Sequence, residues 1–156
     1  MERLLLVALL VSLALGTSVP EFEEKNWHSH CFLKRVTHFS CPTVGDTTLL
    51  AIELINAKLP SYVQIGKFGV SDNNEHFLTA TVGKGWWTHD VQLVFTDHEE
   101  GCLVHAKSQS SWFSFFYNQE ADYCAIIPLL EILNYHTQDL YDCENTVSSW
   151  TECLKY

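Results

Sequence analysis

Basic residues are scarce in this chain of 156 residues. Nine lysines and arginines stand against nineteen aspartates and glutamates, which gives a net charge of −10. Such a charge repels nucleic acids and anionic lipids, so no nucleic-acid partner is expected. It favours cationic partners or weakly held calcium, or it simply keeps the protein in solution. The acidic residues form only short clusters, at 21–24 and 97–100, and no calcium-loop motif, so we expect no metal site.

The chain also lacks the short motifs of common catalytic and metal-binding sites. It has no C-x-x-C pair, no H-E-x-x-H segment, no G-x-S-x-G elbow and no glycosylation sequon. We therefore expect no cofactor and no enzymatic activity. Asp90, His105 and Ser108 supply the side-chain types of a hydrolase, but no motif positions them, so a small secreted hydrolase is only an alternative.

Long apolar runs are rare too, and the longest lies at the N-terminus. The stretch Leu4–Leu15 follows a short charged start and precedes small residues, which predicts a secretory signal peptide over residues 1–16. The alternative is an uncleaved anchor, but the run is shorter than the roughly 20 residues of a spanning helix. We therefore predict a secreted, extracellular protein with no transmembrane segment after signal removal.

Six cysteines follow the predicted signal peptide. An even number of cysteines in an exported chain predicts disulfides, because the compartment is oxidising. The sequence leaves the pairing open. Cys102 and Cys124 could meet, and the others form either local pairs or bridges between an N-terminal and a C-terminal segment. The six are Cys31, Cys41, Cys102, Cys124, Cys143 and Cys153.

The hydrophobic pattern predicts a single domain of α+β class. A leader over 17–45 precedes the domain at 46–136, and a tail over 137–156 packs on it. Apolar residues at helical spacing predict helices over 46–59 and 122–136, the first with Leu50 and Leu54 on its apolar stripe. Alternating residues predict strands over 62–70, 76–82, 87–95 and 102–110, with 111–118 as a fifth strand or a loop. The expected fold is a two-layer sandwich, an antiparallel sheet of four to five strands with two helices on one face.

Several blocks of this pattern resemble the family of the domain of unknown function 1499 (DUF1499). They cover the central part of the chain and lie at Pro42–Asp46, Leu59-Pro60, Leu78–Ala80, Asp90–Phe95, Val104–Ser110 and Asn118. The family's R-S-x-S-R stretch differs here, because Lys107-Ser108-Gln109-Ser110 lacks both arginines. The resemblance implies a fold and no particular activity.

Aromatic residues give the main functional indication. Both alternate positions of 111–118 are apolar, so a strand there would expose one set to solvent unless other segments cover both faces. We expect an aromatic binding surface for an apolar ligand or an extracellular protein. The expected members are Trp86, Trp87, Trp112, Phe113, Phe115, Phe116 and Tyr117. The sequence thus favours a secreted, non-enzymatic binding or structural protein, with an acidic extracellular-matrix or biomineral-associated protein as the alternative.

Overall fold

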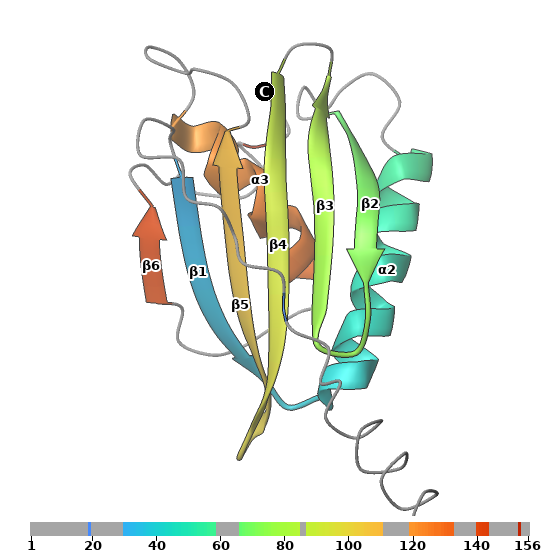
Figure 1. Ribbon diagram of the computed structural model, residues 1–156, viewed down its shortest axis with the longest axis vertical. Coiled ribbons are helices and arrows are strands. Elements are labelled where there is room, and N and C mark those ends of the chain that lie inside the picture. Colours follow the sequence, from blue (N-terminus) through green and yellow to red (C-terminus); the bar gives the residue numbers. More distant parts are fainter. Residues whose placement is uncertain are drawn as a thin grey trace, which may run out of the picture.

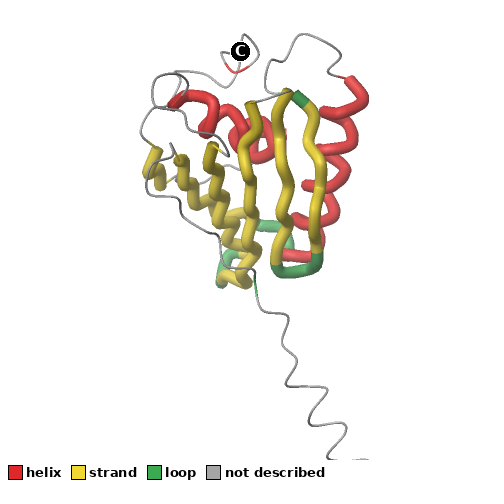
Figure 2. Tube along the Cα trace, turned by 45° about the horizontal axis from the view of Figure 1, so that its top comes forward, coloured by secondary structure: helices red, strands yellow, loops and turns green. Residues whose placement is uncertain are grey.

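The computed structural model describes residues 19, 30–58, 66–84, 87–110, 119–132, 140–143 and 153. Within these ranges the chain forms one antiparallel sheet of six strands, in the order β2-β3-β4-β5-β1-β6. Both helices, α2 (Cys41–Lys58) and α3 (Gln119–Ile132), cover the same face of this sheet (Figure 1). The strands are β1 (His30–Thr37), β2 (Lys67–Asn73), β3 (Phe77–Lys84), β4 (Trp87–His98), β5 (Gly101–Ser110) and β6 (Leu140–Cys143). The predicted two-layer α+β class is therefore confirmed (Figure 2).

The predicted meander corresponds to β2, β3, β4 and β5, but the sheet extends beyond it. β1 comes from the segment predicted as a leader, and β6 comes from the predicted tail. β1 lies between β5 and β6 and pairs antiparallel with both. Its alternation is weak in the sequence because Arg35 and Thr37 share the buried side with Leu33. Arg35 donates a hydrogen bond to the carboxylate of Glu131 on α3 over 3.2 Å.

Helix α2 begins five residues before the predicted start at Asp46. Proline has no N–H to donate, but the first turn of a helix leaves its N–H groups unpaired anyway, so Pro42 fits there. Ser40 precedes the helix, and its carbonyl oxygen accepts a hydrogen bond from the N–H of Val44 over 3.0 Å. The sequence-based boundary was wrong because it treated this proline as the end of a loop.

The buried face of α2 also differs from the predicted stripe. Leu50 and Leu54 were expected to widen the apolar face, yet they are 54% and 43% exposed. Small or polar residues take their place against the sheet, among them Ala51 and Thr48. Thr48 donates its hydroxyl hydrogen to the carbonyl oxygen of Val44 over 2.8 Å, which satisfies this polar group inside the core.

Two further predictions need correction. The second helix, predicted over 122–136, begins earlier, because α3 starts at Gln119 and contains Pro128 in its interior. The end of the strand predicted over 62–70 is also displaced, because β2 continues to Asn73. Its register with β3 shifts between Val70 and Asp72, so an extra residue is accommodated as a bulge.

Three disulfides connect segments that are distant in the sequence. They join Cys31 to Cys143, Cys41 to Cys102, and Cys124 to Cys153. The local pairs and the Cys102–Cys124 pair considered from the sequence do not form. The bridge between Cys31 and Cys143 does join the predicted leader to the predicted tail. Disulfides of this number are typical of extracellular proteins.

A polar contact and a close backbone approach connect parts of the fold that are distant in the sequence. On α2, Asn56 donates to the carbonyl oxygen of Phe68 over 2.8 Å and accepts from the Phe68 N–H over 2.9 Å. This side-chain amide ties the edge strand β2 to the helix. At the start of β5, Gly101 has a φ of 138°, and a Cβ there would collide with the Thr37 carbonyl oxygen and the His38 backbone. Only glycine fits this close approach.

Candidate functional site

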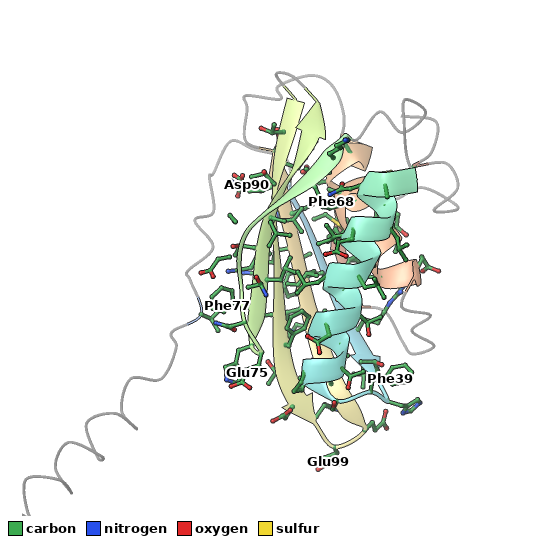
Figure 3. The ribbon with its side chains drawn as sticks, turned by 90° about the vertical axis from the view of Figure 1, so that its right-hand side faces the viewer. Phe39, Phe68, Glu75, Phe77, Asp90 and Glu99 are labelled. Carbon is green, nitrogen blue, oxygen red and sulfur yellow. A yellow bond between two sulfur atoms is a disulfide. The ribbon has the colours of Figure 1, made fainter. Side chains whose placement is uncertain are left out.

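The two faces of the sheet have different surroundings. Phe68 lies between the sheet and α2, whereas Phe77 and Asp90 project from the opposite side (Figure 3). We call this opposite side, away from both helices, the outer face. The outer face is where the described residues gather basic and aromatic side chains.

Four residues on two neighbouring strands form what we call the basic patch. Phe32 and Lys34 come from β1, and His105 and Lys107 come from β5. The strand register places Phe32 opposite Lys107 and Lys34 opposite His105. Because alternate residues of a strand share a face, all four side chains lie on the same side of the sheet.

The Phe32 ring lies at the centre of the basic patch. The Lys34 ammonium lies 5.5 Å from the ring centroid and the Lys107 ammonium 5.6 Å from it. Both distances are within the range of cation–π attraction. The His105 ring is 6.1 Å from the Phe32 ring, centroid to centroid, and is tilted by 58°. One aromatic ring thus lies close to two cations and an imidazole.

The basic patch is electrostatically positive. Burial of His105 lowers its pKa below the ordinary value of 6.5, and repulsion from Lys34 and Lys107 lowers it further. The imidazole therefore resists taking up a proton as long as nothing anionic is near. Lys34 has no carboxylate within ion-pair distance among the described residues. A group of this kind is suited to an anion.

The composition of the outer face changes along the strands. On one side of the basic patch the register aligns Val36 with Leu103, and Val94 lies opposite both His105 and Phe77. On the other side the cross-strand positions are polar. They hold Gln92 and Gln109, which are 4% and 2% exposed, and the carboxylate of Asp90. The basic patch thus separates an apolar area from a polar one.

A second polar cluster is buried between the sheet and α3. His89 Nδ1 lies 2.8 Å from Oδ1 of Asp122, whose side chain is fully buried. Ser108 is buried beside them, and its hydroxyl donates to the Asp122 carbonyl oxygen over 2.5 Å. The other carboxylate oxygen of Asp122 has no hydrogen-bond partner in the part of the chain that the structure describes. The cluster links β4 and β5 to the first half of α3.

This arrangement does not assemble the hydrolase constellation considered from the sequence. Asp90 and His105 lie on the outer face, whereas Ser108 lies on the helix side of β5. The Ser108 hydroxyl hydrogen is used by a main-chain carbonyl and not by a histidine. A nucleophilic serine needs a base within hydrogen-bond reach, and neither His105 nor His89 accepts this hydrogen.

Most of the predicted aromatic surface lies outside the described residues. This applies to Trp86, Trp112, Phe113, Phe115, Phe116 and Tyr117, while Trp87 begins β4 without a described side chain. Among the residues with described side chains, the exposed large apolar ones do not form an aromatic cluster. They are Val19, Phe39, Leu50, Leu54 and Val70.

A small pocket of about 210 Å³ lies at the end of the sheet where α2 begins. Its polar wall includes Asp46, Asn74 and Glu75, and its apolar wall includes Leu78 and Phe95. Within the described ranges, no group of three or more histidine, cysteine, aspartate and glutamate side chains is placed to hold a metal ion. No described helix combines the length and the apolar character needed to cross a membrane.

The basic patch was missed in the sequence analysis, although a signal for it exists. The segments F-x-K at 32–34 and H-x-K at 105–107 each place two of the four residues on one face of a strand. Only the pairing of β1 with β5 brings these two segments together. Because β1 was assigned to the leader, this pairing was not foreseen.

Comparisons of this chain with known proteins show a similarity of fold to a solved structure and identify no protein family. No protein-family model matches the chain, so the resemblance to DUF1499 stays a prediction. No sequence among the curated proteins matches it either. The solved structure of CalU16 from Micromonospora echinospora is similar, with a TM-score of 0.50 and 10% identity over 69% of this chain and 74% of that chain. CV1439 from Chromobacterium violaceum has a TM-score of 0.42 and 8% identity over 69% and 94% of the two chains. At such identity, the likeness to CalU16 extends to the fold alone.

Proposed function

We propose that this protein is a secreted binding protein without catalytic activity, and that the outer face of its sheet receives the ligand. The observation that carries the proposal is the basic patch, in which Phe32 and three basic side chains form one group on two central strands. Regular strands position side chains more precisely than loops do. The disulfides support an extracellular location, because such bonds persist in oxidising compartments.

The buried cluster around Asp122 is better explained as a structural contact. Its histidine and serine are committed to the same aspartate, through the side chain and the main chain respectively. We therefore assign it to the stability of the fold and assign recognition to the outer face.

Native mass spectrometry of the unreduced, secreted protein tests this proposal. We expect a non-covalent component on the wild-type protein that is lost from the Lys34→Glu variant. Thr47→Glu, at an exposed position of α2, is the control and retains the component. A component retained equally by both variants, or a bare wild-type protein that also captures no extracellular protein, would overturn the proposal.

A further inference from the structure

One of the three disulfides holds an edge strand in place, and it is also the one that is not fully buried. We propose that the bond between Cys31 and Cys143 is a redox switch, which a dithiol reductant opens to release β6 and uncover the edge of β1. The switch goes beyond the proposed function and does not depend on a ligand of the outer face.

The cysteines differ in their access to solvent. Cys143 is partly exposed, whereas its partner Cys31 is 1% exposed. Thiol–disulfide exchange requires that a thiolate reach one of the two sulfur atoms of the bond. The folded protein therefore admits a reductant at Cys143 and excludes it from the other two bonds. The four cysteines of those bonds are buried: Cys41, Cys102, Cys124 and Cys153.

Strand β6 has little else to hold it on the sheet. It consists of the four residues Leu140–Cys143 at the edge of the sheet (Figure 1), and among the described strands it pairs with β1 alone. Cys31 and Cys143 are directly opposite each other in this pairing. A short edge strand with few backbone contacts opens locally at low cost once its covalent tie is broken. β1 itself stays in the sheet, because it pairs with β5 along its whole length.

A second disulfide makes this opening reversible. Cys124 and Cys153 are both fully buried and are joined across 29 positions. Cys143 lies within the loop that their bond closes. After release of β6 the loop stays tethered to α3, so the effective concentration of Cys143 near Cys31 remains high. An oxidant such as oxidised glutathione then re-forms the bond.

The reduction proceeds by two exchange steps. A thiolate of the reductant attacks Sγ of Cys143, the bond between the two cysteines breaks, and the Cys31 sulfur leaves as a thiolate. The second thiol of the reductant attacks the mixed disulfide, which frees Cys143 and leaves the reductant as a disulfide. Two electrons thus pass from the dithiol to the protein. The N–H and C=O groups of β1 that had paired with β6 are then open to another strand.

The test is reduction of the full secreted chain by dithiothreitol under native conditions, with alkylation at intervals and peptide mapping by mass spectrometry. We expect Cys31 and Cys143 to be alkylated at least about tenfold faster than the other four cysteines, because buried bonds react only after the fold opens. Hydrogen exchange should accelerate in β6 as this bond is lost, whereas exchange at Val91 in the centre of the sheet should stay slow. Oxidised glutathione should restore slow exchange in β6.

A pair of variants separates this bond from general destabilisation. Replacing both Cys31 and Cys143 with serine should give fast exchange in β6 without any reductant, whereas Thr47→Ser, at an exposed position of α2, should leave it slow. If the double variant does not fold, reduction of the wild-type protein decides the question. Alkylation of all six cysteines at one rate, or earlier loss of another bond, would overturn the switch. Slow exchange in β6 after selective reduction would overturn it equally.

Discussion

His89 and Asp122 are 33 positions apart in the chain, yet Nδ1 of the imidazole lies 2.8 Å from Oδ1 of the carboxylate. Asp122 is fully buried, and its main-chain carbonyl also accepts from Ser108. A buried carboxylate is tolerated only when it is paired and hydrogen-bonded. This pair therefore contributes to holding α3 against the sheet.

Replacing Asp122 should be among the most damaging single changes in the chain. We expect Asp122→Ala to lower the free energy of unfolding by about 3–5 kcal/mol, because it leaves His89 buried without its partner. Asp122→Asn keeps a hydrogen-bond acceptor and should cost less. Urea denaturation measures both, with Asp97→Ala at an exposed position as the control. A loss for Asp122→Ala no larger than that of the control would contradict the assigned role.

The amide of Asn56 should protect the edge of the sheet. Asn56→Ala removes two hydrogen bonds to the backbone of Phe68, so we expect a loss of about 1–3 kcal/mol. Hydrogen exchange at the Phe68 N–H should accelerate, because its acceptor is the Asn56 side chain. Exchange at Val91, in the centre of the sheet, should stay slow. Unchanged exchange at Phe68 would show that this contact is not maintained in solution.

Gly101 should tolerate no side chain. Gly101→Ala places a Cβ against the Thr37 carbonyl oxygen and the His38 backbone, and it requires a φ of 138° that favours glycine. We expect a loss of at least about 2 kcal/mol, seen as a lower thermal midpoint. Gly69→Ala is the matched control, since a Cβ there makes only ordinary contacts. Equal midpoints for the two variants would refute this reading.

Peptide mapping of the unreduced protein should find three long-range disulfide pairs. We expect Cys31 with Cys143, Cys41 with Cys102, and Cys124 with Cys153. Loss of the bridge between Cys41 and Cys102, by replacing both with serine, should cost about 4 kcal/mol, because it closes a loop of 61 positions. Recovery of a Cys31–Cys41 peptide from the native protein would contradict the strand order.

The imidazole of His105 should titrate below the ordinary range. Burial and the nearby lysines lower its pKa from 6.5, so the unfolded chain takes up this proton before the folded chain does. The contribution of neutral His105 to the free energy of unfolding is therefore fully present above pH 6.5. It is lost as the pH falls through the pKa that His105 has in the folded protein. Nuclear magnetic resonance of the ring protons should show the pKa rising in Lys34→Gln. An unchanged pKa in that variant would remove the electrostatic basis of the basic patch.

The class of fold could be predicted because β3, β4 and β5 alternate clearly. In β4, for example, Val91, Leu93 and Phe95 all face the helices and are buried. β1 could not be assigned in the same way, since Arg35 breaks the apolar pattern and is buried only through contacts formed in the tertiary structure, including the one to Glu131. A polar side chain that is buried because its partner is distant in the sequence does not contribute to the local hydrophobic pattern that predicts a strand.

The local distribution of charge also could not be predicted from the composition. The net charge of −10 favoured cationic partners, yet Lys34, His105 and Lys107 gather on one face of the sheet. Net charge averages over the whole surface, whereas a binding surface depends on the few groups within about a Debye length. The disulfide pairing could not be predicted from the sequence either, because it depends on β1 lying between β5 and β6.

The position of β1 has a consequence for how the chain matures. Cys31 and its partner are separated by 112 positions, whereas Cys41 is far nearer along the chain. In an exported chain that emerges from its N-terminus, Cys31 and Cys41 meet the oxidising compartment well before Cys143. An early bond between these two must later be exchanged through attack by a thiolate. If the chain is exported, as we propose, its maturation should therefore involve exchange between cysteines, the reaction that disulfide isomerases catalyse.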